Sequence, residues 1–166
     1  MCIRDSIKAE CIWFDTGFIS YTFPAYPLSH HECREITFGF EICSETFFYN
    51  NNWPSDITVY INEAEIATFT SPGDFGGRRG RYTPDYWPVT STQFGLWKKV
   101  TVNGNGVFLD NVFLHGKVTF DDLKLYDGSG IKFKIGVKED ALHKGGLNLF
   151  GKNFGDYPQA IVMTVK

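Results

Sequence analysis

The sequence lacks the spacing of apolar residues that helices require. Nowhere do apolar residues recur at intervals of three and four over the ~10 to 12 residues of a typical helix. No apolar run approaches the ~20 residues that are needed to span a bilayer. These absences argue against a helical fold and against a membrane-spanning helix within these residues, so we expect no membrane partner.

Cysteine is scarce and unevenly placed. Of four cysteines, Cys2 stands in an unusual N-terminal segment, which leaves Cys11, Cys33 and Cys43 as an odd, widely spaced set without a C-x-x-C pair. This pattern predicts neither a disulfide framework nor a zinc site. We expect Cys11 and Cys43 to pack as small apolar side chains, and we expect the protein to occupy a reducing, cytoplasmic compartment.

Positive charge is also in short supply. The 166 residues carry a net charge of −3, whereas nucleic-acid binding depends on basic side chains that contact phosphates. We therefore expect that this part of the protein does not bind DNA by itself.

Catalytic motifs that can be recognised by their spacing are missing. The chain holds no G-x-S-x-G, no H-E-x-x-H and no G-x-x-x-x-G-K-[ST]. We interpret His30-His31 as part of a polar loop rather than a metal site. We interpret Glu139-Asp140 with His143 as part of a solvated loop rather than a catalytic or metal cluster. The sequence does not show whether Glu41 and Glu139 face each other, as the two carboxylates of a glycosidase would. We predict no enzymatic activity, no cofactor and no metal site.

The first six residues read MCIRDS. This string is the translation of a transposon-end adapter used in shotgun DNA library preparation. We interpret residues 1–6 as carry-over fused to a truncated reading frame, and a genuine but unusual start is the alternative. On the first interpretation, residues 7–166 are one domain from the C-terminal part of a longer protein, and their number suits a single compact domain.

The chain does contain short alternating runs separated by Gly, Pro and Asn. The clearest lies within residues 33–44, where Ile36, Phe38, Phe40 and Ile42 recur at period two. Further extended runs are expected at residues 7–14, 18–23, 57–61, 64–70, 96–103, 107–109, 112–114, 131–138, 147–150 and 159–165. Residues 118–125 fit either a strand or one helical turn.

This series of strands predicts the fold class. We expect residues 7–14 and 18–23 to form an opening hairpin, and the charges of residues 131–138 to discourage edge pairing. About ten short strands between turn signals indicate an all-β fold, a two-sheet antiparallel β-sandwich of jelly-roll type.

Residues 53–81 combine a hairpin with a loop rich in Gly and Arg. Asn62-Glu63 predicts a tight reversal between two extended runs. The loop DFGGRRGR, residues 74–81, can cradle an anion, because glycines free backbone N–H groups and arginine offers a bidentate fork. The equally weighted alternative is a surface turn in which Asp74 pairs with Arg78 or Arg79.

Two long loops, residues 45–54 and 82–95, are rich in aromatic, Asn, Asp and Pro residues. Aromatic faces combined with short polar side chains hold saccharides and other flat polar ligands. The alternative is that these aromatics cover the open end of the core. The residues that we predict to bind a ligand are Trp53, Asp56, Asp74, Arg78, Arg79, Trp87 and Glu139.

Several motifs carry a family resemblance. The most specific are NNWPSDI, TSPGDFGGRRG, GVKEDA and NLFGKNFGDY. The chain from about residue 7 to its end resembles the C-terminal domain of bacterial ArsR-type winged-helix transcriptional regulators, found mainly in Firmicutes. It departs mildly at Glu63-Ala64, where a turn containing Gly would form more easily. The resemblance implies that a DNA-binding winged helix precedes this segment, and it implies no ligand or binding residues.

These observations leave three hypotheses open. The preferred one is the effector domain of a cytoplasmic transcriptional regulator that binds a saccharide or another small polar ligand and contacts DNA only through an N-terminal domain. The second is a structural domain that forms a homodimer. The third is a carbohydrate-binding module of a larger secreted enzyme, against which the odd number of cysteines argues.

Overall fold

The protein is described by a computed structural model that covers residues 9–25, 33–126, 128 and 130–166. The interpretations of residues 1–6 and of His30-His31 lie outside these residues. The elements are β1 (Cys11–Phe14), β2 (Gly17–Phe23), β3 (Glu35–Cys43), β4 (Ser55–Ile61), β5 (Ala64–Ser71), β6 (Leu96–Asn103), β7 (Gly106–Leu109), β8 (Val112–His115), the 3-10 turn η1 (Asp121–Leu123), β9 (Ile131–Val137), β10 (Leu147–Phe150) and β11 (Val162–Val165).

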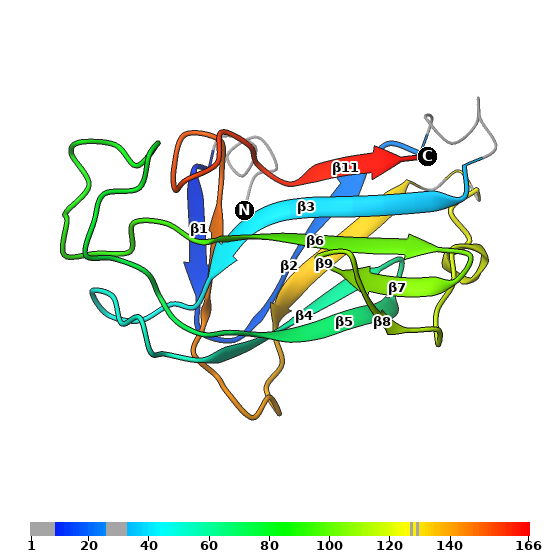
Figure 1. The fold of residues 1–166 in the computed structure, drawn as a ribbon, viewed down its shortest axis with the longest axis horizontal. Helices are drawn as coiled ribbons and strands as arrows, with labels where there is room; N and C mark the ends of the chain where they lie inside the picture. The colour runs from blue at the N-terminus through cyan, green and yellow to red at the C-terminus, as the bar shows by residue number, and fades with distance from the viewer. Residues whose placement is uncertain (1–8, 26–32, 127, 129) are drawn as a thin grey trace.

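Eight of these strands form a jelly roll. The first sheet contains the order β1-β10-β3-β6 and the second the order β2-β9-β4-β5, and all their pairings are antiparallel. The chain crosses between the sheets after β1, β2, β3, β5, β8 and β9, which is the double Greek-key winding of this fold. Strands β7 and β8 extend the first sheet beyond β6, and β11 pairs with β3 beside β10 (Figure 1). The predicted two-sheet β-sandwich is confirmed.

The core forms where the alternating residues of both sheets meet. Ile36, Phe38, Phe40 and Ile42 are all buried, as their period-two spacing predicts. Phe133 of β9 faces them, with its ring stacked on that of Phe38 at a centroid distance of 4.6 Å. This packing supplies the apolar burial on which the sandwich depends.

The predicted opening hairpin is wrong. Strand β1 pairs with β10 in the first sheet, and β2 pairs with β9 in the second. The bend between them carries the chain from one sheet to the other, so their partners come from more than a hundred residues away. By contrast, the hairpin of β4 and β5 is confirmed, and Asn62 and Glu63 form its turn with φ values of 46° and 66°.

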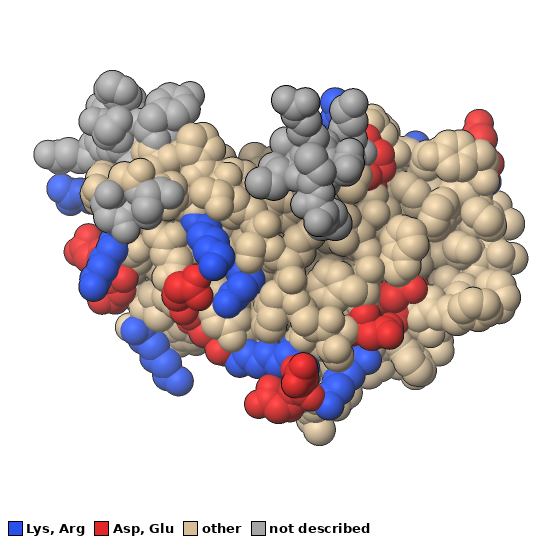
Figure 2. Space-filling view, turned by 180° about the vertical axis from the view of Figure 1, so that it is seen from behind, with Lys and Arg blue, Asp and Glu red and all other residues tan. Residues whose placement is uncertain are grey.

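Strand β9 is not an edge strand, because it lies between β2 and β4. Its charges therefore do not serve the edge protection that the sequence suggested. Its exposed lysines pair with the carboxylates of the β4–β5 hairpin: Lys132 and Lys134 with Glu63, and Lys138 with Glu65. Basic and acidic side chains are interspersed on the side of the molecule opposite the view of Figure 1 (Figure 2). Within the part of the chain that the structure describes, there is no helix with the length and apolarity to cross a membrane.

The side of β3 that faces away from the core is also buried. Gly39 lies against the Trp97 ring, and Thr37, Glu41 and Cys43 are hardly accessible to solvent. The segment between β10 and β11 lies over this side of the strand (Figure 1), and the backbone amide of Asp156 contacts Glu41. A carboxylate is thereby enclosed at the end of the sandwich where the long loops gather.

Candidate functional site

The first aromatic loop, residues 45–54, meets the start of the Gly/Arg loop at one end of the sandwich. The backbone N–H of Asp74 donates to the carbonyl of Asn50 at 2.9 Å, and that of Trp53 donates to the carbonyl of Pro72 at 3.0 Å. The β9–β10 loop joins them, because the N–H of Glu45 donates to the carbonyl of Gly145 at 2.7 Å. Segments that are remote in sequence therefore build one continuous loop surface.

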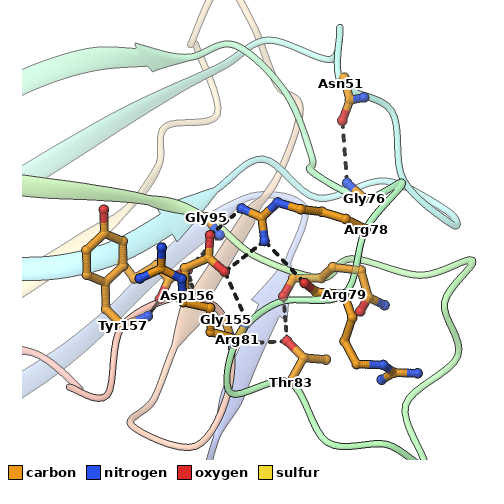
Figure 3. A network of polar contacts seen from close by, with 12 residues as sticks. Asn51, Gly76, Arg78, Arg79, Arg81, Thr83, Gly95, Gly155, Asp156 and Tyr157 are labelled. Atoms are coloured by element: carbon orange, nitrogen blue, oxygen red, sulfur yellow. Dashed lines mark hydrogen bonds and ion pairs between the residues drawn. The ribbon is translucent and has the colours of Figure 1, made fainter.

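Glu41 of β3 fixes this end of the molecule. Its carboxylate accepts hydrogen bonds from the backbone N–H groups of Gly95, Asp156 and Tyr157 at 2.8 to 3.0 Å. The structure shows these amides gathered beside the Arg78–Asp156 pair (Figure 3). Burial raises the pKa of Glu41, and the three backbone hydrogen bonds oppose that rise. One side chain thus ties the β5–β6 loop and the β10–β11 segment to the central strand.

The arginines of the Gly/Arg loop are engaged by the protein itself. Arg78 forms a bidentate pair with Asp156, in which one bond is 3.0 Å long, and its guanidinium lies 3.6 Å from the centre of the Phe94 ring. Arg79 donates to the carbonyls of Pro84, Asp85 and Trp87. The alternative in which Asp74 pairs with Arg78 or Arg79 is wrong, because the carboxylate that pairs with Arg78 is that of Asp156 and Arg79 binds backbone carbonyls.

The glycines of these loops permit close packing. Gly80 lies so close to the carbonyl of Gln93 that a Cβ would overlap it, and Gly155, at φ 84°, lies in the same way against the Glu41 carboxylate. A side chain at Gly155 would displace Glu41 and strain the backbone. Both glycines therefore serve packing in the structure, rather than an open anion cradle.

Asp74 is fully buried beneath the loops. Its Oδ2 accepts hydrogen bonds from the Thr46 N–H at 3.0 Å and from the Thr92 hydroxyl at 2.9 Å, and the Cys43 thiol lies 3.9 Å from Oδ1. Burial raises the pKa of Asp74 to about 6, with the three hydrogen bonds opposing it. Asp74 joins both long loops to the end of β3.

Above Asp74 lies a cavity of about 250 Å³, which we name the loop-end cavity. Its aromatic lining comes from Trp13 of β1, from Phe47 and Phe48 of the first long loop, and from Trp87 of the second. The rings form two edge-to-face pairs: Trp13 with Trp87 at 6.3 Å and Phe47 with Phe48 at 4.6 Å between centroids. Residues of both long loops therefore lie around one hollow.

Polar groups complete the lining of the loop-end cavity. They are the carboxylate of Glu45, the carboxamide of Asn148, and residues Thr46, Ser91 and Thr92. The Asn148 amide donates to the carbonyl of Ser44 at 2.7 Å, which fixes its orientation. Burial raises the pKa of Glu45 to about 7; Asn148 lowers it, while Asp74 and Asp15 raise it further. Aromatic rings with a few fixed polar groups are typical of small-molecule sites.

The seven predicted residues divide between several places. Trp87 lines the loop-end cavity, Asp74 lies beneath it, and Arg78 and Arg79 hold the loop that carries Trp87. Trp53 and Asp56 lie at the β9–β10 loop: Trp53 lies beside Gly145, and Asp56 accepts a hydrogen bond from the His143 N–H. Glu139 is exposed on that loop and, among the described residues, has no ion pair or hydrogen bond.

Of the nine described residues that line the cavity, sequence reasoning selected only Trp87, and four of those that it missed carry the proposed chemistry. Trp13, Glu45, Phe48 and Asn148 lie in three different segments, and their convergence depends on the pairing of β1 with β10. One signal was available in the sequence: two adjacent phenylalanines stand in a polar, Asn-rich loop. Phe48 also has a φ of 71°, which is uncommon for a bulky residue and holds its ring at the surface.

Comparison with known proteins identifies no relative of this chain. No family model matches it, and neither a curated protein nor a solved structure does so.

The role of Glu41 predicts a large effect of a small substitution. Glu41→Gln places an amide donor where backbone N–H groups need an acceptor, so we expect the free energy of unfolding to fall by about 2 kcal/mol. The measurement is urea unfolding followed by tryptophan fluorescence. Glu139→Gln removes the same charge from an exposed loop and should change stability by less than about 0.5 kcal/mol. Equal effects of the two variants would contradict the role of Glu41.

The raised pKa of Asp74 predicts that stability depends on pH. The native state holds the proton up to a pH of about 6, whereas the unfolded chain loses it near ~4. Stability therefore falls as the pH rises from about 4 to 7, by at most about 3 kcal/mol for this group. Asp74→Asn, which keeps an acceptor oxygen for Thr46 and Thr92, should flatten this fall in urea unfolding at pH 5 and pH 8. Asp140→Asn, in an exposed position, is the control and should leave the slope unchanged.

Proposed function

We propose that this is a non-catalytic domain that binds a saccharide or another small polar molecule in the loop-end cavity. The observation that carries the proposal is the convergence of Trp13, Trp87 and Phe48 with the polar groups of Glu45 and Asn148 around one hollow. Rings present flat faces to sugar C–H groups, and fixed polar side chains hydrogen-bond hydroxyls. The site is built from the two long loops together with Trp13 of β1 and Asn148 of β10.

The size of the cavity limits the ligand. A volume of about 250 Å³ lies below the range of ~300 to 1,000 Å³ that is common for small-molecule sites. It accommodates one sugar ring or a molecule of similar size. Longer ligands would extend from it across the exposed ring of Phe47.

The biological setting that we propose is a cytoplasmic transcriptional regulator of the ArsR type, in which this domain is the effector. The motifs NNWPSDI, TSPGDFGGRRG and NLFGKNFGDY all lie on the segments that build the loop end. The resemblance and the cavity thus concern the same part of the molecule. Ligand binding would act by favouring one arrangement of N-terminal winged-helix domains over another, which requires different affinities for the two arrangements.

The reading frame upstream of residue 7 tests this setting. Sequencing the genomic locus is expected to show a winged-helix domain encoded in frame before this domain. A signal peptide and a catalytic domain in that position would instead favour a carbohydrate-binding module of a secreted enzyme.

A second candidate function, homodimerisation, is favoured by strand β8. This strand ends the first sheet, and Val112, Phe113 and Leu114 are all exposed on it. Unpaired strand edges and clustered apolar side chains are typical of surfaces that associate. This surface lies at the opposite edge of the first sheet from β1. Binding in the cavity and pairing through β8 are therefore compatible.

Trp13→Ala tests the proposed binding site. A panel of mono- and disaccharides is first screened by thermal shift, and hits are measured by calorimetry with the purified chain. We expect Trp13→Ala to weaken binding of each hit by about fivefold, because stacking on one aromatic ring is worth about 1 kcal/mol.

Phe113→Ala provides the matched control. Phe113 is as exposed as Trp13, at 55% for each side chain, but lies on β8, so affinity should not change. Equal affinities of the Trp13→Ala variant and the unaltered protein would place the ligand elsewhere. If no ligand binds and Phe113→Ala halves the molar mass in light scattering, dimerisation is the better-supported function.

A further inference from the structure

We propose that the loop-end cavity selects ligands that carry a positive charge, such as amino sugars or quaternary ammonium compounds. This inference rests on the proposed binding function and specifies the chemical class of the ligand. Its starting point is the balance of charges in the cavity lining, which contains the carboxylate of Glu45 and no Lys, Arg or His among the described residues.

Glu45 lacks a countercharge within the described protein. Its charged neighbours are Asp74 and Asp15, which repel its ionised form, and the neighbour that lowers its pKa is the uncharged amide of Asn148. The nearby arginines are committed elsewhere, Arg78 to Asp156 and Arg79 to backbone carbonyls. A partly buried carboxylate in such a setting gains most from a cation that enters beside it.

The aromatic lining favours the same class of ligand. The face of a Trp ring attracts a cation within about 6 Å of its centre, and the attraction is largest when water is excluded. Trp13 and Trp87 are set at an interplanar angle of 64°, and Phe47 and Phe48 at 67°. Four aromatic rings and the acidic residue Glu45 line this one hollow, and aromatic rings combined with an acid are the composition of the cages that recognise quaternary ammonium groups.

Anionic ligands are disfavoured by the same geometry. A phosphate or carboxylate in the cavity would face Glu45 and the more deeply buried Asp74, without a basic side chain from the lining to neutralise it. Although the Gly/Arg loop is the most basic segment nearby, its guanidinium groups are held by Asp156 and by the carbonyls of Pro84, Asp85 and Trp87.

The test compares probes that differ in charge and not in shape. Choline and its uncharged analogue 3,3-dimethylbutan-1-ol form one pair, and glucosamine and glucose form the other. Affinities are measured by calorimetry for the unaltered protein, for Glu45→Gln and for Glu139→Gln, at pH 8 for the choline pair and at pH 7 for the glucosamine pair, because an amine of this kind loses its proton at about pH 8. We expect the charged member of at least one pair to bind at least tenfold more tightly than its neutral partner, and Glu45→Gln to remove most of this preference. Glu139→Gln should leave it unchanged.

A pH series adds a readout that a purely structural role of Glu45 would not give. Choline keeps its charge at every pH, so its affinity should rise several-fold between pH 5.5 and pH 8 as Glu45 ionises. Asp15, Asp74 and Cys11 also surround Glu45. Burial raises the pKa of the Cys11 thiol, which keeps it neutral throughout. Repeating the series with Asp74→Asn separates the contribution of Asp74.

The outcomes distinguish this inference from the proposed function. Neutral probes that bind as tightly as charged ones would overturn the charge preference and leave the proposed function standing. A preference that survives in Glu45→Gln would overturn the role of this cavity in charge selection. If neither these probes nor the saccharide panel binds, both the inference and the proposed function fail.

Discussion

The buried carboxylate of Glu41 is the interaction on which the functional end of this protein depends. A jelly roll leaves the ends of its sheets open, and the loops there need partners for their backbone N–H groups. Glu41 supplies acceptors for three of these groups, which come from the β5–β6 loop and from the β10–β11 segment. Glu41 thereby links strand β3, in the middle of the first sheet, to two loops that contain little regular secondary structure.

This coupling determines what the Gly/Arg loop can do. Once Asp156 is held by Glu41, its carboxylate lies where Arg78 forms a bidentate pair and where the N–H of Arg81 also donates. Arg79 then caps the carbonyls of the following loop, and that loop presents Trp87 to the cavity. The residues that suggested an anion site from their composition act instead as the support of an aromatic wall.

The sequence allowed the prediction of features that depend on local patterns. The period-two spacing of Ile36, Phe38, Phe40 and Ile42 marked β3 and its buried face, and Asn62-Glu63 marked the β4–β5 turn. The partners of β1 and the burial of Glu41 escaped prediction, because both depend on residues more than a hundred positions away. Glu41 stood in a pattern typical of a solvent-facing side, and only the later segment that covers β3 reverses that expectation.

The placement of charge in the molecule supports a division between structural and functional surfaces. On the outer side of the second sheet, Glu63 pairs with Lys132 of β9 and Glu65 pairs with Lys138, directly after β9, so the charges there neutralise one another.

At the loop end, Glu45 and Asp74 lie close together, and burial raises the pKa of both. Buried carboxyl groups that lack a cationic partner lower the stability of the folded state when they ionise. A positively charged ligand that binds beside them would reduce this loss of stability. Among the described residues, the proposed site has acids and no basic side chain, and a cationic ligand would supply the missing positive charge. Binding would then be coupled to the rigidity of both long loops, because Asp74 links Thr46 of the first to Thr92 of the second. That link is a physical route by which occupancy of the cavity can reach both long loops.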